Sequence, residues 1–209
     1  MFEALPVEAV AADGRIVYRR GALVKHLPEG RIVYAPLPPV FTPGRYASHM
    51  MIEFPVQVLA PGERRRVYLK FPIDVGVFLE RSGRYVLVDA FSLARVKYAL
   101  YCDPGNGVLA RWWRSDAYTQ PPMVDPDSEG LMELEIANGG EWAKVSRAVF
   151  SCGGMPLYYS SHAAVKARME VKGRWAETYF LESPPLEGMA RAPDPGLGGE
   201  GRFEMRCGI

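Results

Sequence analysis

Hydrophobic and polar residues alternate in short segments along almost the whole chain. The segment at 165–171 shows this most clearly, because Val165, Ala167, Met169 and Val171 alternate with charged residues. A period of two residues is typical of a β-strand with one buried face. The same pattern predicts strands at 15–20, 31–34, 49–54, 65–71, 74–80, 84–91, 96–101, 108–113, 131–137, 142–150, 155–160 and 174–180.

Turn residues such as Asp13-Gly14, Ser82-Gly83 and Asn138-Gly139-Gly140 separate these segments at short intervals. Short, evenly spaced strands favour antiparallel sheets. The segments at 92–100 and 161–169 also fit a helix, but the two-residue period fits them better. We therefore predict an all-β fold, an antiparallel β-sandwich of immunoglobulin-like type with one or two packed lobes.

Composition divides the chain into three regions. Prolines and acidic residues interrupt the strand pattern at 118–130, which is typical of a connection between two units. We predict a β-sandwich lobe at 1–118 and a smaller β lobe at 127–182, either as a second unit or as part of one cooperative domain. Residues 183–209 are rich in proline and glycine, and we expect a loosely attached tail that ends in an added edge strand.

The balanced charge of the chain changes the picture of its partners. Twenty-five basic and 24 acidic side chains give a net charge of +1, which disfavours nucleic acid or a membrane surface as the partner. No stretch resembles a signal peptide or a membrane span, so we expect a cytoplasmic protein. Scarce asparagine and glutamine favour a thermophilic source. Three widely spaced cysteines, Cys102, Cys152 and Cys207, predict buried thiols in a reducing compartment.

One long string carries a family resemblance. KYALYCDPGNGVLARWWRSDAY, with FPIDVGVFLE before it and GLMELEIANGGEWAKVSRAVF and GMPLYYS after it, resembles an archaeal domain-of-unknown-function family, the one numbered 432. The resemblance covers about residues 50 to 182. It implies an archaeal source and a shared fold, and it carries over no activity, ligand or catalytic residue.

The acidic segment contains a candidate cation site. Asp125, Asp127 and Glu129 alternate before Gly130, as oxygen ligands do at the start of a calcium loop. An EF-hand is excluded because its twelfth position would be Ile136 and a strand follows. A looser cation site in a sandwich loop and a solvated acidic linker are the two remaining interpretations.

A second candidate is a ligand or interaction surface at Arg111, Trp112, Trp113 and Arg114. Aromatic rings and guanidinium groups together can stack on a base or a sugar, or on each other within the fold. Because neighbouring residues of a strand face opposite ways, we expect one tryptophan in the core and the other exposed or covered by a neighbouring lobe.

No motif of the chain matches a nucleophilic enzyme, a phosphate loop or a zinc site, so we predict no catalytic residue and no cofactor. Asp103 to Gly107 is expected to form a hairpin turn. A set of five arginines could bind an anion or protect a strand edge, namely Arg64, Arg65 and Arg66 together with Arg81 and Arg84. The residues weighed in these interpretations are Cys102, Cys152, Ser160, Ser161, His26, His49, His162, Arg64, Arg65, Arg66, Arg81 and Arg84.

These observations favour a non-catalytic binding or assembly module. An exposed edge strand would pair with a protein partner or with a second copy of the chain. The alternative is a cation-dependent ligand-binding protein or enzyme with a carboxylate-lined site between the lobes. Its carboxylates would be Asp103, Asp116, Asp125 and Asp127.

Overall fold

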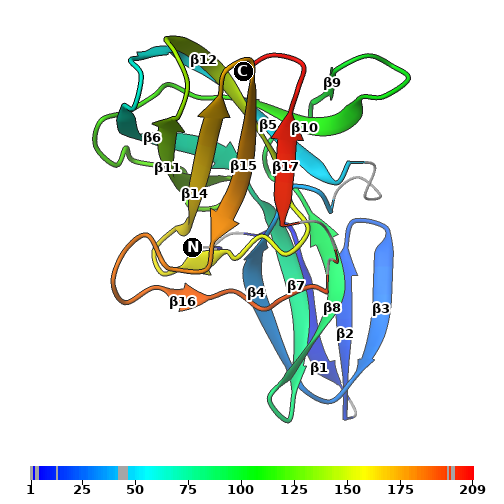
Figure 1. Ribbon diagram of the computed structural model, residues 1–209. Helices are drawn as coiled ribbons and strands as arrows, with labels where there is room; N and C mark the ends of the chain where they lie inside the picture. The colour runs from blue at the N-terminus through cyan, green and yellow to red at the C-terminus, as the bar shows by residue number, and fades with distance from the viewer. Residues whose placement is uncertain (1, 3–4, 13, 42–46, 197, 199–200) are drawn as a thin grey trace.

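The computed structural model describes residues 2, 5–12, 14–41, 47–196, 198 and 201–209 (Figure 1). All the regular secondary structure in these residues consists of β-strands, so the predicted all-β fold is confirmed. The described part of the chain contains no helix that could cross a lipid bilayer. The strands are β1 (Glu8–Ala12), β2 (Arg15–Arg20), β3 (Leu23–Pro28), β4 (Arg31–Leu37), β5 (His49–Leu59), β6 (Arg64–Pro72), β7 (Asp74–Arg81), β8 (Arg84–Phe91), β9 (Tyr98–Tyr101), β10 (Val108–Arg114), β11 (Glu129–Asn138), β12 (Ala143–Ser151), β13 (Tyr158–Tyr159), β14 (Ala163–Lys172), β15 (Trp175–Leu181), β16 (Ala190–Arg191) and β17 (Arg202–Met205).

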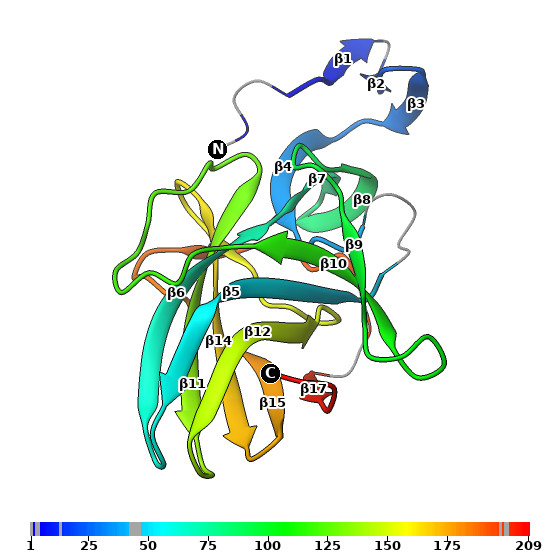
Figure 2. The ribbon, with the colours of Figure 1, turned by 90° about the horizontal axis from the view of Figure 1, so that it is seen from above.

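Two sheets form a main sandwich. One has the order β12-β5-β10-β9. The other has the order β16-β13-β14-β11-β6, and β15 pairs with β14 and carries β17 on its other side. Figure 2 shows β5, β10 and β12 lying across β11, β14 and β15. The prediction of antiparallel sheets is correct only in part, because β10 runs parallel to β5 and β11 runs parallel to β14. Alternation reveals the buried face of a strand but not its direction.

The alternating residues of β14 lie as their pattern predicts. Val165, Ala167, Met169 and Val171 are buried in the core between the two sheets, while Arg168 and its charged neighbours point away from the core. The apolar faces of β5, β6, β11 and β12 complete the same core. The main sandwich is therefore held together by one continuous apolar interior.

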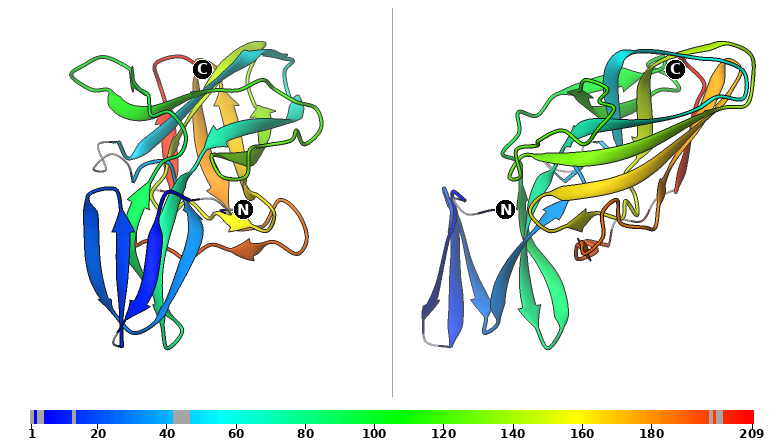
Figure 3. Two further views of the ribbon diagram at one scale, coloured as in Figure 1. Left: turned by 180° about the vertical axis from the view of Figure 1, so that it is seen from behind. Right: turned by 90° about the vertical axis from the view of Figure 1, so that its left-hand side faces the viewer.

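Two three-stranded sheets form a small sandwich beside the main one, with the orders β1-β2-β3 and β4-β7-β8. Figure 3 shows the β1–β3 sheet standing away from the main sandwich. Tyr18, Val75, Val77 and Phe91 are the fully enclosed residues of its separate core. Because Phe78 on the opposite face of β7 belongs to the main core, β7 joins the two sandwiches.

The strands on either side of the predicted boundary at 118–130 are hydrogen-bonded to each other. β5 pairs with β12 and β6 pairs with β11, so residues 1–118 and 127–182 do not divide into two separate sheets. In the region at 183–209, β16 pairs with β13 and β17 pairs with β15, so both strands belong to the seven-stranded sheet. The predicted edge strand at the end of this region corresponds to β17.

Candidate functional site

The four residues at 111–114 do not form a common surface. Arg111 is fully buried and donates a hydrogen bond from Nη2 to Ser92 Oγ at 3.0 Å, whereas Arg114 is exposed. Trp112 packs against the main core, with Lys97 Nζ 5.0 Å from its ring centre. Both Trp112 and Trp113 are half-buried, so neither is fully enclosed and neither is fully exposed. The loop that leads into β9 supplies Ser92 and Lys97, and the backbone oxygen of Lys97 accepts a hydrogen bond from Trp112 N at 2.9 Å.

The carboxylates of the acidic segment accept hydrogen bonds from their own loop and from neighbouring segments. Asp125 accepts hydrogen bonds from Asp127 N at 3.2 Å and from Ser128 Oγ at 2.6 Å, and Asp127 accepts one from Phe2 N. Glu129 Oε2 lies 3.1 Å from Lys70 Nζ, so this loop is tied to β6. Within the described ranges, no group of three or more His, Cys, Asp or Glu side chains could hold a metal ion. The cation site stays a prediction.

One of the four carboxylates proposed for the alternative function lies in a hollow. Asp116 lines a hollow of about 450 Å³ beside the middle of β5 and β12 and the end of β10, together with Glu53, Arg114 and Arg147. Asp125 and Asp127 do not line this hollow. The backbone oxygen of Asp103 accepts hydrogen bonds from the amides of the turn between β9 and β10, as a hairpin turn requires. Of the four carboxylates of the alternative hypothesis, this hollow therefore contains Asp116, and Glu53 joins it there.

The cysteines differ from the prediction of three thiols. Cys102 and Cys207 form a disulfide with a Cα–Cα distance of 5.2 Å, across a sequence separation of 105. No spacing pattern signals a pair this far apart, because the fold alone brings the end of the chain beside β9. Cys152 is a free, fully buried thiol. Burial and the nearby charge of Asp74 raise its pKa, which makes it a poor nucleophile.

The histidine beside Ser161 is partly enclosed. His162 Nδ1 lies 3.1 Å from Ser161 Oγ, and desolvation lowers the pKa of its imidazole. Its Nε2 atom is buried and has no hydrogen-bond partner among the described residues. The contact is between sequence neighbours, so it provides no orienting third group of the kind that a catalytic triad needs.

The basic residues separate into two groups. On β6, Arg65 pairs with Glu63 at 2.6 Å and Arg66 pairs with Glu133 at 3.5 Å. Arg81 and Arg84 lie in another sheet, opposite each other at the end of the β7–β8 hairpin. The anion-binding surface considered for all of these residues is therefore divided, and Glu63 and Glu133 neutralise two of the three arginines of its first half.

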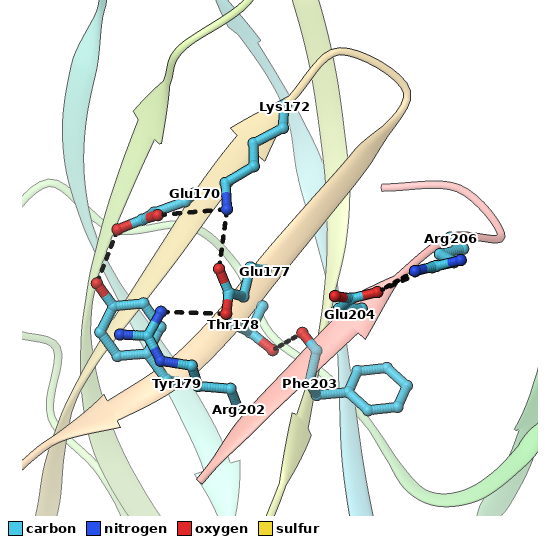
Figure 4. Close-up of polar contacts among 9 residues, drawn as sticks. All are labelled: Glu170, Lys172, Glu177, Thr178, Tyr179, Arg202, Phe203, Glu204 and Arg206. Atoms are coloured by element: carbon cyan, nitrogen blue, oxygen red, sulfur yellow. Dashed lines mark hydrogen bonds and ion pairs between the residues drawn. The ribbon is translucent and has the colours of Figure 1, made fainter. Parts of the chain in front are cut away.

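The outer face of β14, β15 and β17 pairs its charges internally (Figure 4). Glu177 lies between Lys172 at 2.9 Å and Arg202 at 3.0 Å, and hydrogen bonds from these two cations lower the pKa of its carboxyl group. The hydroxyl of Tyr179 donates to Glu170 at 2.8 Å. A face that neutralises its own charges offers little electrostatic attraction to a partner.

In contrast to this charged face, the small sandwich has an open edge at β1. All five residues of β1 are exposed, and among the described strands β1 pairs with β2 alone. After Glu8 it has no charged residue, and the side chain of Val10 is 48% exposed. β3, at the other edge of the sheet, contains Lys25 and Pro28, which discourage pairing. The sequence prediction missed β1 because only Val10 in EAVAA has a high β-propensity.

The comparisons with known proteins agree with the resemblance seen in the sequence and extend it. Residues 5–201 match a family described as "Protein of unknown function (DUF432)". Neither the curated proteins nor the solved structures contain a significant match. The family therefore assigns no residue to a reaction, and any functional argument must start from the geometry described above. The chain belongs to the DUF432 family.

Proposed function

We propose that this protein is a non-catalytic assembly module, and that its contact is the edge strand β1 pairing with β1 of a second copy. The observation that supports this proposal is the exposed, almost uncharged edge of β1 (Figure 3). An unpaired edge presents a row of backbone donors and acceptors, and pairing satisfies them. Two sheets of three strands would then become one sheet of six.

Antiparallel pairing centred on Val10 gives a consistent arrangement of side chains. Val10 faces its own copy, and Glu8 faces Ala12 of the second copy. The register within each sheet places Arg19 beside Glu8 and Arg15 beside Ala12. Glu8 therefore lies between its own Arg19 and, one strand further, Arg15 of the second copy, which is favourable for a two-fold contact.

Native mass spectrometry over a concentration series tests this proposal, and we expect a dimer. Val10→Lys places two lysines opposite each other at the two-fold axis, and it should give a monomer. Val24→Lys is the matched control, because Val24 is 50% exposed on β3 and lies outside the predicted contact. A wild-type monomer at all concentrations, or a dimer that survives Val10→Lys, would refute the proposal.

We further propose that the protein works in the cytoplasm of a thermophilic archaeon. The ion pairs across β14, β15 and β17 support this, because networks of charged residues are more frequent at high temperature. The disulfide is compatible with it, since intracellular proteins of hyperthermophilic archaea are often rich in disulfides.

A second candidate function is cation-dependent ligand binding in the hollow at Glu53 and Asp116. Two carboxylates beside Arg114 and Arg147 favour a small charged ligand. Native mass spectra before and after chelator treatment test it. A chelator-sensitive mass that is lost in Asp116→Asn would support this function, and unchanged apo spectra would refute it.

A further inference from the structure

A hollow of about 480 Å³ lies between the two sheets of the small sandwich. Its walls are apolar, and the side chain of Val86 is 60% exposed there. The β1–β3 sheet therefore leaves the end of the β7–β8 hairpin uncovered. The apolar lining residues are Leu27, Pro28, Leu79, Val86, Leu87 and Val88.

The charged residues that line this hollow are all basic, namely Lys25, Arg81 and Arg84. Lys25 donates from Nζ to the backbone oxygen of Val88 at 2.5 Å and is therefore engaged within the protein. Arg81 and Arg84 form no ion pair with any residue that the structure describes, in contrast to Arg202, which binds Glu177.

The register of the hairpin places Arg81 directly opposite Arg84, across the turn at Ser82 and Gly83. Like charges that face each other across two strands destabilise a hairpin. An anion between two guanidinium groups removes this repulsion and accepts strong, charge-assisted hydrogen bonds. The facing guanidinium groups are therefore complementary to a negative charge.

We propose that this hollow binds a small amphipathic anion, a molecule with an apolar chain or ring and one negatively charged head group. The apolar part lies against Leu27, Leu79 and Val86, and the head group lies between Arg81 and Arg84. The volume falls within the range of about 300–1,000 Å³ that is usual for small-molecule sites. The site is independent of the proposed self-association, which uses the edge of β1.

Isothermal titration calorimetry of the full chain tests this proposal with three probes, each below its micelle concentration. Dodecanoate has both the chain and the anionic head, dodecyltrimethylammonium has the chain with a positive head, and acetate has the head alone. We expect dodecanoate to bind at one molecule per chain, at least tenfold more tightly than either of the others.

The double variant Arg81→Gln/Arg84→Gln should weaken dodecanoate binding at least tenfold. Arg95→Gln/Arg174→Gln is the matched control, since it removes two exposed arginines that line neither hollow, and it should bind dodecanoate as the wild type does. Absence of dodecanoate binding would overturn the proposal. Equal binding of the cationic probe, or full binding by the Arg81/Arg84 variant, would also overturn it by showing simple adsorption to an apolar surface.

Thermal unfolding without ligand gives a second readout. Arg84→Gln should raise the unfolding midpoint, because it removes the repulsion from Arg81, and a lowered midpoint would contradict the electrostatic argument. Native mass spectra of the same samples separate this site from the proposed self-association. A monomer that binds dodecanoate refutes only the dimer, and a dimer that does not bind it refutes only the site.

Discussion

The outer face of the seven-stranded sheet and the small sandwich follow the same alternation but complete their surfaces differently. On the sheet face, Glu177 binds both Lys172 and Arg202, so the charges are satisfied within the chain (Figure 4). In the small sandwich, Arg81 faces Arg84 and β1 has an open edge. The difference teaches that alternation predicts which side of a strand is polar, but not whether that side is self-sufficient. Binding is expected at a surface whose charges and backbone groups are not satisfied within the chain.

Removing Phe71 tests how far the stability of both regions depends on the main core. Phe71 is fully buried on β6, and Phe71→Ala should cost about 3–5 kcal/mol in the free energy of unfolding, measured with urea. Hydrogen exchange should show both sandwiches destabilised, because β7 contributes to both cores. Val24→Ala, an exposed truncation outside the proposed contact, is the control. Unchanged protection in the small sandwich would mean that the two regions unfold independently.

Breaking the disulfide tests what fixes the last strand to the main sandwich. Cys207→Ser should cost about 2–4 kcal/mol, because a link across 105 residues restricts the unfolded chain. Reductant should destabilise the wild type by a similar amount and leave the variant unaffected. A thiol assay on unfolded, unreduced protein should detect one free thiol, Cys152, and a count of three would contradict the pairing.

Replacing Asp89 tests the polar clamp that joins the two sheets of the small sandwich, which consists of Asp89 on β8 with Tyr18 and Arg20 on β2. Its carboxylate accepts hydrogen bonds from Tyr18 at 2.7 Å and Arg20 at 2.6 Å. Burial opposes its ionisation, but the hydrogen bonds from Arg20 and Tyr18 outweigh burial, so the pKa of Asp89 is lowered. Its stabilisation is therefore complete above the unfolded-state pKa of about 3.9 and is lost as the pH falls through the lower folded-state pKa.

Asp89→Asn should cost about 1–3 kcal/mol at pH 7, because it leaves Arg20 and Tyr18 with a weaker partner. Hydrogen exchange should show the loss mainly in β2 and β8, and the variant should lack part of the acid sensitivity. Asp116→Asn, in the exposed hollow of the main sandwich, is the control. Equal protection of β2 in wild type and Asp89→Asn would show that the clamp is not needed.

The smallest effect is expected on the sheet face itself. Glu177→Gln should cost less than about 1 kcal/mol, since both of its partners, Lys172 and Arg202, are exposed to water that screens the pairs. The difference from wild type should shrink further in 1 M salt, as measured by urea unfolding. Glu182→Gln, which affects a more exposed pair with Arg191, should cost still less. A loss above about 2 kcal/mol would mean that this network acts as a buried one.

Local pattern predicted much of the fold. The limits of β2 and β8 agree with the predicted segments, and the Asp103 to Gly107 turn is a hairpin as expected. β1, β3 and β16 were missed, because they are short or poor in β-branched residues. These strands acquire their order from neighbours in the sheet, which a single segment does not reveal.

The candidate site was less predictable because it depends on distant contacts. The burial of Arg111 follows from a loop that packs over β10, and the pairing of Cys102 with Cys207 follows from the path of the chain. Arg81 and Arg84 were recognised as a possible anion site, yet only the fold separates them from the neutralised arginines of β6. Local spacing identifies the chemistry, and topology decides which groups meet.

The bond between Cys102 and Cys207 also sets how the molecule responds to mechanical force. The hydroxyl of Tyr101 donates to Gly208 O at 2.9 Å and accepts from Cys207 N at 3.0 Å, so the covalent link lies within a local clamp. A pull applied beyond residue 207 is transmitted to β9 instead of peeling β17 from β15. A protein-unfolding motor that pulls beyond residue 207 must therefore thread two segments of the disulfide-closed loop at the same time, or wait until the disulfide is reduced.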